Sequence, residues 1–121
     1  MPFCRAASVT EVRDGTTKMV RVEGRSVLLA HWRGRFYAFA SRCPHQGNSL
    51  EGARLWQATL ECPWHHFRYD LATGVNCYPA NVYPSDLPQL AEQLDPLPTY
   101  PVQVRDGEVV VGLPDLEPAR R

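Results

Sequence analysis

Apolar and polar positions in the first forty residues fall into short runs typical of β-strands. Residues 18–23, 26–32 and 35–41 are rich in β-branched and aromatic side chains, and short glycine-containing turns separate them. Gly24 and Gly34 stand where tight hairpins need a positive φ angle. The pattern therefore predicts three consecutive antiparallel strands.

The same pattern returns near the end of the chain. Residues 101–105 and 108–112 flank Asp106-Gly107, which is a strong signal for a two-residue hairpin. Strand character also resumes in residues 67–74, FRYDLATG, which end in a turn signal. We expect the two ends of the chain to form one antiparallel β scaffold that carries the segment between them as an insertion.

A proline-rich stretch precedes the last two strands. Residues 79–101 hold six of the eleven prolines of the chain. Proline cannot donate to a sheet ladder, so this stretch is predicted to be loop rather than central strand. Within it, residues 85–94 have the cap and the leucine spacing of one short helix, which we expect to pack on the scaffold.

Length and charge narrow the class of protein. A chain of 121 residues is one domain of ordinary size. Its 13 basic and 13 acidic residues cancel, which argues against a nucleic-acid partner. The longest apolar run, residues 27–32, is far too short to cross a bilayer, and the N-terminal residues lack a signal-peptide pattern. We therefore expect a cytoplasmic protein with no membrane partner.

Cysteine and histidine gather in the middle of the chain. Cys43-x-His45 is followed by sixteen other residues and then by Cys62-x-x-His65. Reduced cytoplasmic thiols favour metal or redox chemistry over a structural disulfide. Two equivalent pairs have no use in a hydrolase that needs one thiolate and one base. A structural zinc site remains an open alternative. A motif in which each half carries one cysteine and one histidine, however, suits a site with two unlike metal positions better.

These motifs resemble those of the Rieske-type 2Fe-2S proteins, and in particular the small soluble Rieske ferredoxins. The resemblance rests on CPHQGNSLEG, ECPWHHFRYDLATG, YPA and LPTYPVQVRDGEVVV, and it covers most of the chain. It implies an all-β Rieske fold, in which an antiparallel β-sandwich scaffold carries an inserted two-loop cluster-binding subdomain. Residues 1–121 would then form one domain, with the cluster-binding subdomain at about 42–80 and a proline-rich insertion at about 81–98.

The resemblance also implies the cofactor and its ligands. The cofactor would be one 2Fe-2S cluster, with Cys43 and Cys62 on one iron and His45 and His65 on the other. No catalytic residue is implied, because such a site carries one electron at a time.

Residues around these ligands indicate which kind of Rieske protein this is. High-potential members of the family carry a disulfide between the two loops, and Asn48 and Trp64 occupy the matching positions here. Phe67 replaces a serine that donates a hydrogen bond to the cluster in those members, whereas Tyr69 keeps the matching tyrosine. Pro79 matches a proline loop that shields the cluster. We expect a low to intermediate reduction potential, with Tyr69 raising it.

The remaining cysteines and histidines have simpler interpretations. His31 lies in a predicted strand and is interpreted as structural. His66 adjoins a predicted ligand but matches no motif position, and it is interpreted as a hydrogen-bonded or solvent-facing side chain. Cys4 and Cys77 are interpreted as small packing residues.

The resemblance favours one function over two alternatives. The favoured one is an electron carrier between an NAD(P)H-dependent reductase and a terminal oxygenase, either an aromatic-ring dioxygenase or a multicomponent monooxygenase. The first alternative is the small Rieske-like subunit of an NADH-dependent nitrite reductase, and the second is a zinc-stabilised interaction module. In none of these is the chain itself an enzyme.

Overall fold

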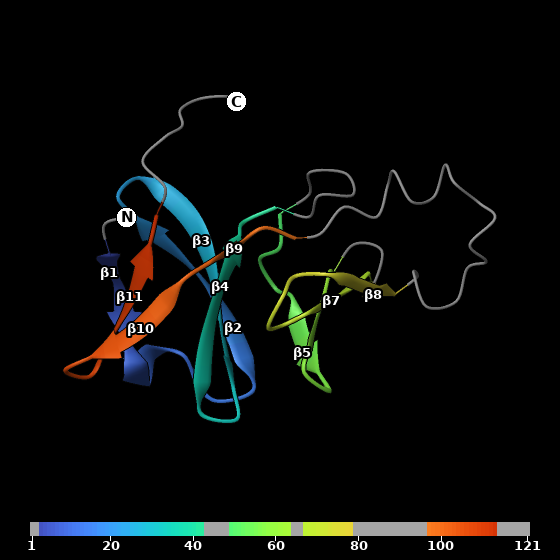
Figure 1. Cartoon of the computed structure of the whole chain (residues 1–121), viewed down its shortest axis with the longest axis horizontal. Coiled ribbons are helices and arrows are strands. Elements are labelled where there is room, and N and C mark those ends of the chain that lie inside the picture. Colours follow the sequence, from blue (N-terminus) through green and yellow to red (C-terminus); the bar gives the residue numbers. More distant parts are fainter. Residues whose placement is uncertain (1–2, 43–48, 64–66, 79–96, 114–121) are drawn as a thin grey trace.

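Three antiparallel β-sheets make up the computed structural model, which describes residues 3–42, 49–63, 67–78 and 97–113 (Figure 1). The strand orders are β1-β11-β10, β2-β3-β4-β9 and β5-β6-β7-β8. The strands are β1 (Phe3–Ser8), β2 (Thr16–Val22), β3 (Arg25–Trp32), β4 (Arg35–Ala40), β5 (Arg54–Trp56), β6 (Thr59–Glu61), β7 (Arg68–Asp70), β8 (Asn76–Tyr78), β9 (Thr99–Tyr100), β10 (Val102–Arg105) and β11 (Glu108–Gly112). A 3-10 turn, η1 (Val9–Glu11), joins β1 to β2. No helix in the described ranges is long and apolar enough to cross a membrane.

The predicted hairpins are present. The strands expected from the sequence match β2, β3, β4, β10 and β11 to within two residues at each end. Two-residue hairpins of type I′ need a positive φ at both turn residues, because only then does the turn follow the twist of the strands. The structure has positive φ angles at three such pairs, namely Glu23-Gly24, Arg33-Gly34 and Asp106-Gly107. The all-β class and the antiparallel scaffold are confirmed.

Strand β3 is buried on both faces. Val27 and Leu29 belong to one core cluster, which also contains Val109 of β11. Leu28 and Ala30 point the other way and belong to a second cluster. A strand covered on both sides reads as a continuous apolar run, which explains the VLLA sequence here. The sheet β2-β3-β4-β9 is therefore the middle layer of the molecule, between the terminal sheet and the sheet β5-β6-β7-β8.

Hydrogen bonds to backbone carbonyls attach the third sheet to this middle layer. The Thr17 hydroxyl of β2 donates to the Ala53 carbonyl at 2.7 Å, just before β5. The Leu97 N–H donates to the Gly74 carbonyl at 2.8 Å, which ties the approach to β9 to the turn between β7 and β8. Leu97 is itself buried in the second core cluster. The third sheet is thus held at two separate points as well as through its core.

Two parts of the fold were not expected from the sequence. Strand β1 pairs with β11 through a register irregularity between Arg5 and Ala7. The β5–β6 hairpin turns at Gln57 and Ala58, which adopt φ angles of 49° and 64° without a glycine. Strand β1 lacks the alternation of apolar and polar residues that predicts a strand, and the β5–β6 hairpin lacks the turn residues that predict a hairpin.

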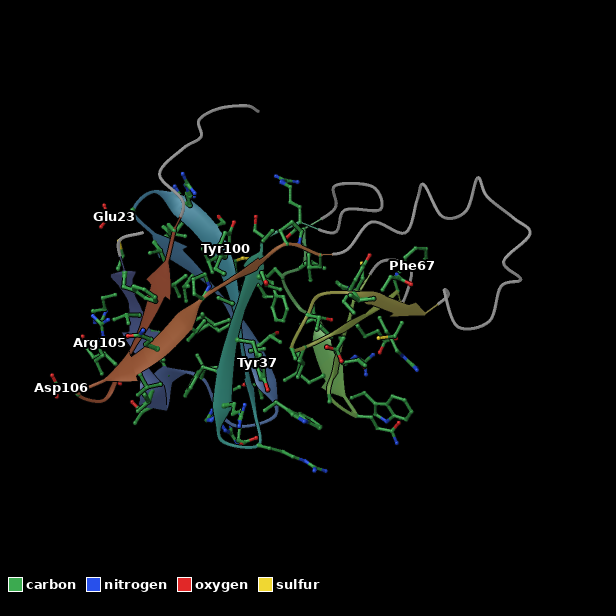
Figure 2. All side chains as sticks on the ribbon, in the orientation of Figure 1. Glu23, Tyr37, Phe67, Tyr100, Arg105 and Asp106 are labelled. Atoms are coloured by element: carbon green, nitrogen blue, oxygen red, sulfur yellow. The ribbon has the colours of Figure 1, made fainter. Side chains whose placement is uncertain are left out.

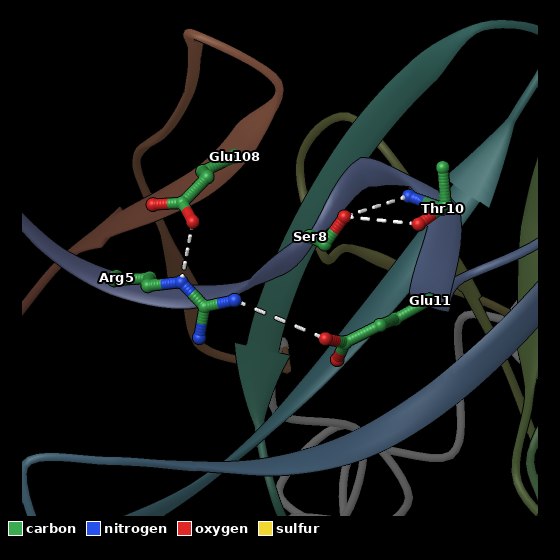
Figure 3. A network of polar contacts seen from close by, with 5 residues as sticks. All are labelled: Arg5, Ser8, Thr10, Glu11 and Glu108. Atoms are coloured by element: carbon green, nitrogen blue, oxygen red, sulfur yellow. Dashed lines mark hydrogen bonds and ion pairs between the residues drawn. The ribbon is translucent and has the colours of Figure 1, made fainter.

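Arg5 links β1 to its neighbours on the surface (Figure 3). Its Nε donates to the Glu108 carboxylate at 2.8 Å, and its guanidinium lies 3.9 Å from the carboxylate of Glu11 in η1. The Glu108 hydrogen bond is the main reason that the pKa of Arg5 is raised. Since the groups are exposed, this network contributes little to stability and chiefly fixes how η1 leaves β1.

Candidate metal centre

The first predicted ligand loop leaves the fold from a closed pair of backbones. Arg42 and Ser49 form an antiparallel bridge, and the Leu50 N–H donates to the Ser41 carbonyl at 2.8 Å. Cys43 and His45 lie in residues 43–48, outside the described part of the chain. The structure thus defines where this loop begins and ends, and the two ends are neighbours.

The second predicted loop has the same kind of base. It follows β6, and the Cys62 N–H donates to the Phe67 carbonyl at 2.7 Å, which continues the β6–β7 ladder by one more pair. His65 and Trp64 lie outside the described residues. Four residues separate Cys62 from Phe67 in the sequence, so the two paired positions are joined by a short connection.

Both loop bases rest on one core cluster. Leu50, at the end of the first loop, and Cys62, at the start of the second, are both essentially inaccessible to solvent and belong to the same cluster. Phe67, at the end of the second loop, packs against that cluster. Segments that are far apart in sequence are therefore held together at the positions from which the two loops depart.

The Cys62 side chain lies on the inner face of the third sheet. It is 1% exposed, and it follows Leu60 by two residues, so the alternation of a strand sends both side chains inward. Tyr69 is directly opposite Leu60 and is fully buried. Cys62 forms no disulfide. A buried thiol at the point where the second loop departs, in one core cluster with aromatic residues, suits a metal ligand shielded from water.

The turn that follows β7 is fixed by one carboxylate. Asp70 Oδ2 accepts hydrogen bonds from the Ala72 and Thr73 N–H groups at 3.1 and 2.9 Å and from the Thr73 hydroxyl at 3.0 Å. The Gly74 N–H donates to the Asp70 carbonyl at 2.7 Å. The Asp-x-x-Thr-Gly part of the motif therefore serves to shape the β7–β8 connection, not to bind metal.

The other cysteines and His31 have structural roles in the described residues. Cys4 packs against the first core cluster. The Cys77 thiol donates to the Val75 carbonyl at 3.5 Å, and burial, with Asp70 nearby, raises its pKa, so it stays protonated. His31 Nδ1 donates to the Val12 carbonyl at 2.8 Å, and its ring stacks on Phe36. Within these ranges, no group of three or more His, Cys, Asp or Glu side chains comes together.

One buried residue near the site escaped the sequence analysis. Asn76 of β8 is 7% exposed and sits opposite Tyr69 in the β7–β8 ladder. A single asparagine close after a glycine turn reads as part of that turn, so the sequence carries no signal for its burial. Pro79, the shielding proline of the motif, lies outside the described residues.

The residues present fit a Rieske-type cluster. The motif supplies two thiolates and two imidazoles, and two thiolates neutralise the charge of an oxidised 2Fe-2S core. A cofactor site without net charge can lie next to apolar side chains at low desolvation cost. Cys62 is part of such a hydrophobic core cluster. The ligand types in the motif and the apolar surroundings of Cys62 therefore both fit a Rieske-type 2Fe-2S cluster.

Comparisons with known proteins identify the family to which the chain is similar. The family model described as "Rieske [2Fe-2S] domain" matches residues 3–101. The 3-phenylpropionate/cinnamic acid dioxygenase ferredoxin subunit of Escherichia coli K12 is 35% identical over 116 residues, 93% of this chain and 95% of that protein. The ferredoxin of Sphingomonas yanoikuyae B1 superposes with a TM-score of 0.74 at 25% identity, covering 93% of this chain and all of that one.

A further solved structure contains an oxygenase as well as a ferredoxin. It is a complex of carbazole 1,9a-dioxygenase, and one of its chains matches with a TM-score of 0.77 at 26% identity. The match covers 98% of this chain and 30% of that one. The similarity thus extends over nearly all of this chain but less than a third of the larger one.

Fold, site and relatives together define a class of iron–sulfur protein. The chain belongs to the Rieske [2Fe-2S] domain family. Its cofactor is one Rieske-type 2Fe-2S cluster, and it is an electron carrier of the ferredoxin type rather than a catalytic component. The predictions of fold family, cofactor and electron-carrier class are confirmed.

Proposed function

We propose that this protein is the ferredoxin of an oxygenase system, and that it passes single electrons from an NAD(P)H-dependent reductase to a terminal oxygenase of the aromatic-ring dioxygenase type. The observation that carries the proposal is the match to a dioxygenase ferredoxin subunit over 93% of this chain and 95% of the relative. A similarity that extends over both proteins supports the same role for the whole chain, not only for a shared fold.

Four residues hold the cluster in this proposal. Cys43 and Cys62 bind one iron through their thiolates, and His45 and His65 bind the other through their imidazoles. The burial of Cys62 and its place at the base of a closed loop support this assignment. Trp64, Phe67, Tyr69 and Pro79 form the surroundings of the cluster.

The bound cluster would supply a one-electron couple, and the chain itself sets the conditions for it. Leu50 and Leu60 exclude water from the Cys62 side of the site. Tyr69 is the hydrogen-bond donor proposed to stabilise the added negative charge after reduction. The backbone pairs Arg42–Ser49 and Cys62–Phe67 hold the ends of both loops together, which favours a small reorganisation on electron transfer.

The ligand assignment is tested by single substitutions in the full chain. We expect Cys43→Ala, Cys62→Ala, His45→Ala and His65→Ala each to lose iron, acid-labile sulfide and the Rieske electron paramagnetic resonance signal. Three matched controls, Cys4→Ala, Cys77→Ala and His66→Ala, are expected to retain all three. Loss of the cluster in a control, or its retention in a ligand variant, would contradict the assignment.

The function is tested with the purified holoprotein under anaerobic conditions. We expect a dioxygenase-type reductase and NADH to reduce one cluster per chain, and a terminal oxygenase of the same type to reoxidise it in stopped-flow absorbance measurements. Stable co-purification with a siroheme protein would contradict this proposal in favour of a nitrite reductase subunit. A colourless protein that contains zinc would contradict both.

The proposal includes the domain division and the location. Residues 1–121 form one domain, residues of about 42–80 bind the cluster, and the proline-rich insertion of about 81–98 adjusts partner choice. Location in the cytoplasm follows from the proposed use of NAD(P)H as the source of electrons. Limited proteolysis of the holoprotein tests the division, since one protected core is expected.

A further inference from the structure

A groove runs along the edge of β4 that β9 leaves unpaired. It consists of two adjoining hollows of about 390 and 360 Å³. Both are lined by Phe36, Tyr37 and Val102, so the two hollows are continuous. The first extends to Leu71 after β7, and the second extends past Val104 to the β3–β4 hairpin.

The groove exists because the chain changes sheets at Pro101. Strand β9 pairs with β4 at only two positions, Ala38 with Tyr100 and Phe39 with Thr99. The Pro101 carbonyl then accepts from the Gly112 N–H at 2.9 Å, so the chain continues as a neighbour of β11. The first half of β4 therefore extends beyond the end of its partner strand.

The backbone of Phe36 faces this gap. In an antiparallel ladder, alternate residues direct both N–H and C=O to one side. On the β9 side these are the even-numbered residues of β4, because the Ala40 N–H donates to the Pro98 carbonyl at 3.0 Å and Ala38 pairs with Tyr100. Phe36 is the next in this series, and β9 supplies no partner for it. An open strand edge of this kind is a template for an added strand.

Side chains along the groove suit a polypeptide ligand. Tyr37 and Tyr100, both labelled in Figure 2, pack on different core clusters and both line the first hollow. Neither hydroxyl forms a hydrogen bond within the described part of the chain, so both can serve an incoming backbone. Val104, on β10, is 52% exposed although it is apolar. Amphipathic aromatic residues beside an exposed aliphatic one are typical of protein interfaces.

One charge decides the kind of ligand. Arg35 is the single charged residue among the described residues that line the groove, and within those residues its guanidinium has no ion pair or hydrogen bond. Asp14, which precedes β2 and is not part of the groove lining, accepts from the N–H groups of Arg33 and Gly34 at the turn of the β3–β4 hairpin. Asp106 lies at the tip of the β10–β11 turn, beyond the groove (Figure 2).

We propose that this groove binds an extended acidic segment of a partner protein as an added strand on β4. The segment's backbone pairs with Phe36, its alternate side chains lie on Tyr37 and Val104, and a carboxylate meets Arg35. A second copy of this chain is a poorer occupant, because two β4 edges would bring two copies of Arg35 together with no carboxylate between them. The surface is separate from the electron-transfer site and independent of the identity of the oxygenase.

The test is fluorescence anisotropy with the holoprotein and two labelled peptides. The probe is a peptide of about eight residues that alternates valine or threonine with glutamate, and its matched control has lysine in place of glutamate. We expect the glutamate peptide to bind roughly tenfold tighter than the lysine peptide, with an affinity that falls as salt is added.

Matched variants locate the binding site. We expect Arg35→Glu to weaken the glutamate peptide roughly tenfold and to favour the lysine peptide. Arg21→Glu, at an exposed position on β2 two strands away, is expected to leave binding unchanged within about twofold. Val104→Asp is expected to weaken binding about fivefold, whereas Val75→Asp, at a similarly exposed valine outside the groove, leaves it unchanged.

Several results would overturn the proposal. These are equal binding of the two peptides, no binding of either, or an equal loss in Arg21→Glu and Val75→Asp. A dimer in sedimentation velocity that Val104→Asp dissociates would also overturn it, because the occupant would then be a second copy. Normal peptide binding by a protein that fails the oxygenase assay would separate this surface from the proposed function.

Discussion

Cys62 and Tyr69 occupy diagonal positions on the same buried face of the β6–β7 ladder. Leu60 is paired with Tyr69, and Cys62 follows Leu60 by two residues while its N–H donates to the Phe67 carbonyl. Diagonal neighbours in an antiparallel pair stand roughly 7–8 Å apart, within reach of a long aromatic side chain. The tyrosine is therefore held beside the one proposed ligand that the described residues contain.

Tyr69→Phe should lower the reduction potential of the protein. A hydrogen bond from the tyrosine hydroxyl to a cluster sulfur, or to the Cys62 thiolate, stabilises the reduced state, which carries one more negative charge. Such a bond contributes about 1.5–3 kcal/mol, so its loss should lower the midpoint potential by roughly 60–130 mV. Redox titration followed by visible circular dichroism measures the change.

Tyr37→Phe is the matched control for this measurement. Tyr37 packs against the same core cluster as Tyr69 but comes from β4. Its loss of a hydroxyl should leave the midpoint potential unchanged within error. An equal midpoint for wild type and Tyr69→Phe would show that the Tyr69 hydroxyl does not reach the cluster.

The scaffold could be predicted from the sequence because its signals are local. Gly24, Gly34 and Gly107 mark turns whose φ angles are positive, and the strands on either side alternate in the usual way. Strand β1 could not be predicted, because FCRAAS gains its strand conformation by pairing with β11, more than a hundred residues later. Tertiary pairing decides a strand of weak propensity.

The candidate site could be predicted as a set of ligands but not as an environment. The paired Cys and His motifs specify chemistry through spacing alone. The packing of Leu50 beside Cys62 depends on the third sheet, whose β5–β6 hairpin turns at Gln57 and Ala58 without a glycine. The burial of Asn76 depends on the same sheet. The predicted helix at 85–94 lies outside the described residues and stays a prediction.

Gly74→Ala should destabilise the attachment of the third sheet. Gly74 has a φ of 78°, and a Cβ at this position would collide with the carbonyl oxygen of Leu97. That contact lies beside the hydrogen bond from the Leu97 N–H to the Gly74 carbonyl, so relief of the clash breaks the bond. We expect a loss of about 3 kcal/mol or more in the free energy of unfolding, measured by chemical denaturation.

Gly107→Ala is the control for Gly74→Ala, because it introduces the same backbone strain without a steric clash. Gly107 has a nearly equal φ of 77°, but no atom lies within 4 Å of the position a Cβ would take. It should therefore cost only about 1 kcal/mol. Equal losses in the two variants would mean that the Leu97 contact has no energetic role.

Stability in acid should depend on Asp14. The Arg33 N–H, with smaller contributions from the Gly34 N–H and the charge of His31, holds the pKa of Asp14 below its usual value of 3.8 in the folded protein. The unfolded chain therefore binds this proton first, so the stabilisation is fully present above pH 4 and is lost as the pH falls through the folded-state pKa. Denaturation midpoints between pH 6 and pH 3 measure the loss.

Asp14→Asn should reduce this acid-dependent loss, because asparagine has no carboxylate to protonate. The variant should be less stable than wild type at pH 6, and the difference should shrink toward pH 3. Asp106→Asn removes another exposed carboxylate, one that forms no hydrogen bond in the described ranges. A pH profile for Asp14→Asn that parallels the profile of wild type would contradict the role of Asp14.

Leu28 and Leu29 are adjacent, fully buried residues of β3 that face different cores, and their alanine variants should therefore differ in kind. Each should lower the free energy of unfolding by about 2–5 kcal/mol, because each leaves a cavity. Leu28 belongs to the same hydrophobic core cluster as Cys62 and Tyr69. Leu28→Ala should therefore also let water reach the 2Fe-2S cluster, and the variant should lose iron to a chelator several-fold faster than wild type. Leu29→Ala should release iron at the wild-type rate under conditions where both variants remain folded. Equal rates in the two variants would mean that the β3 core does not protect the metal centre.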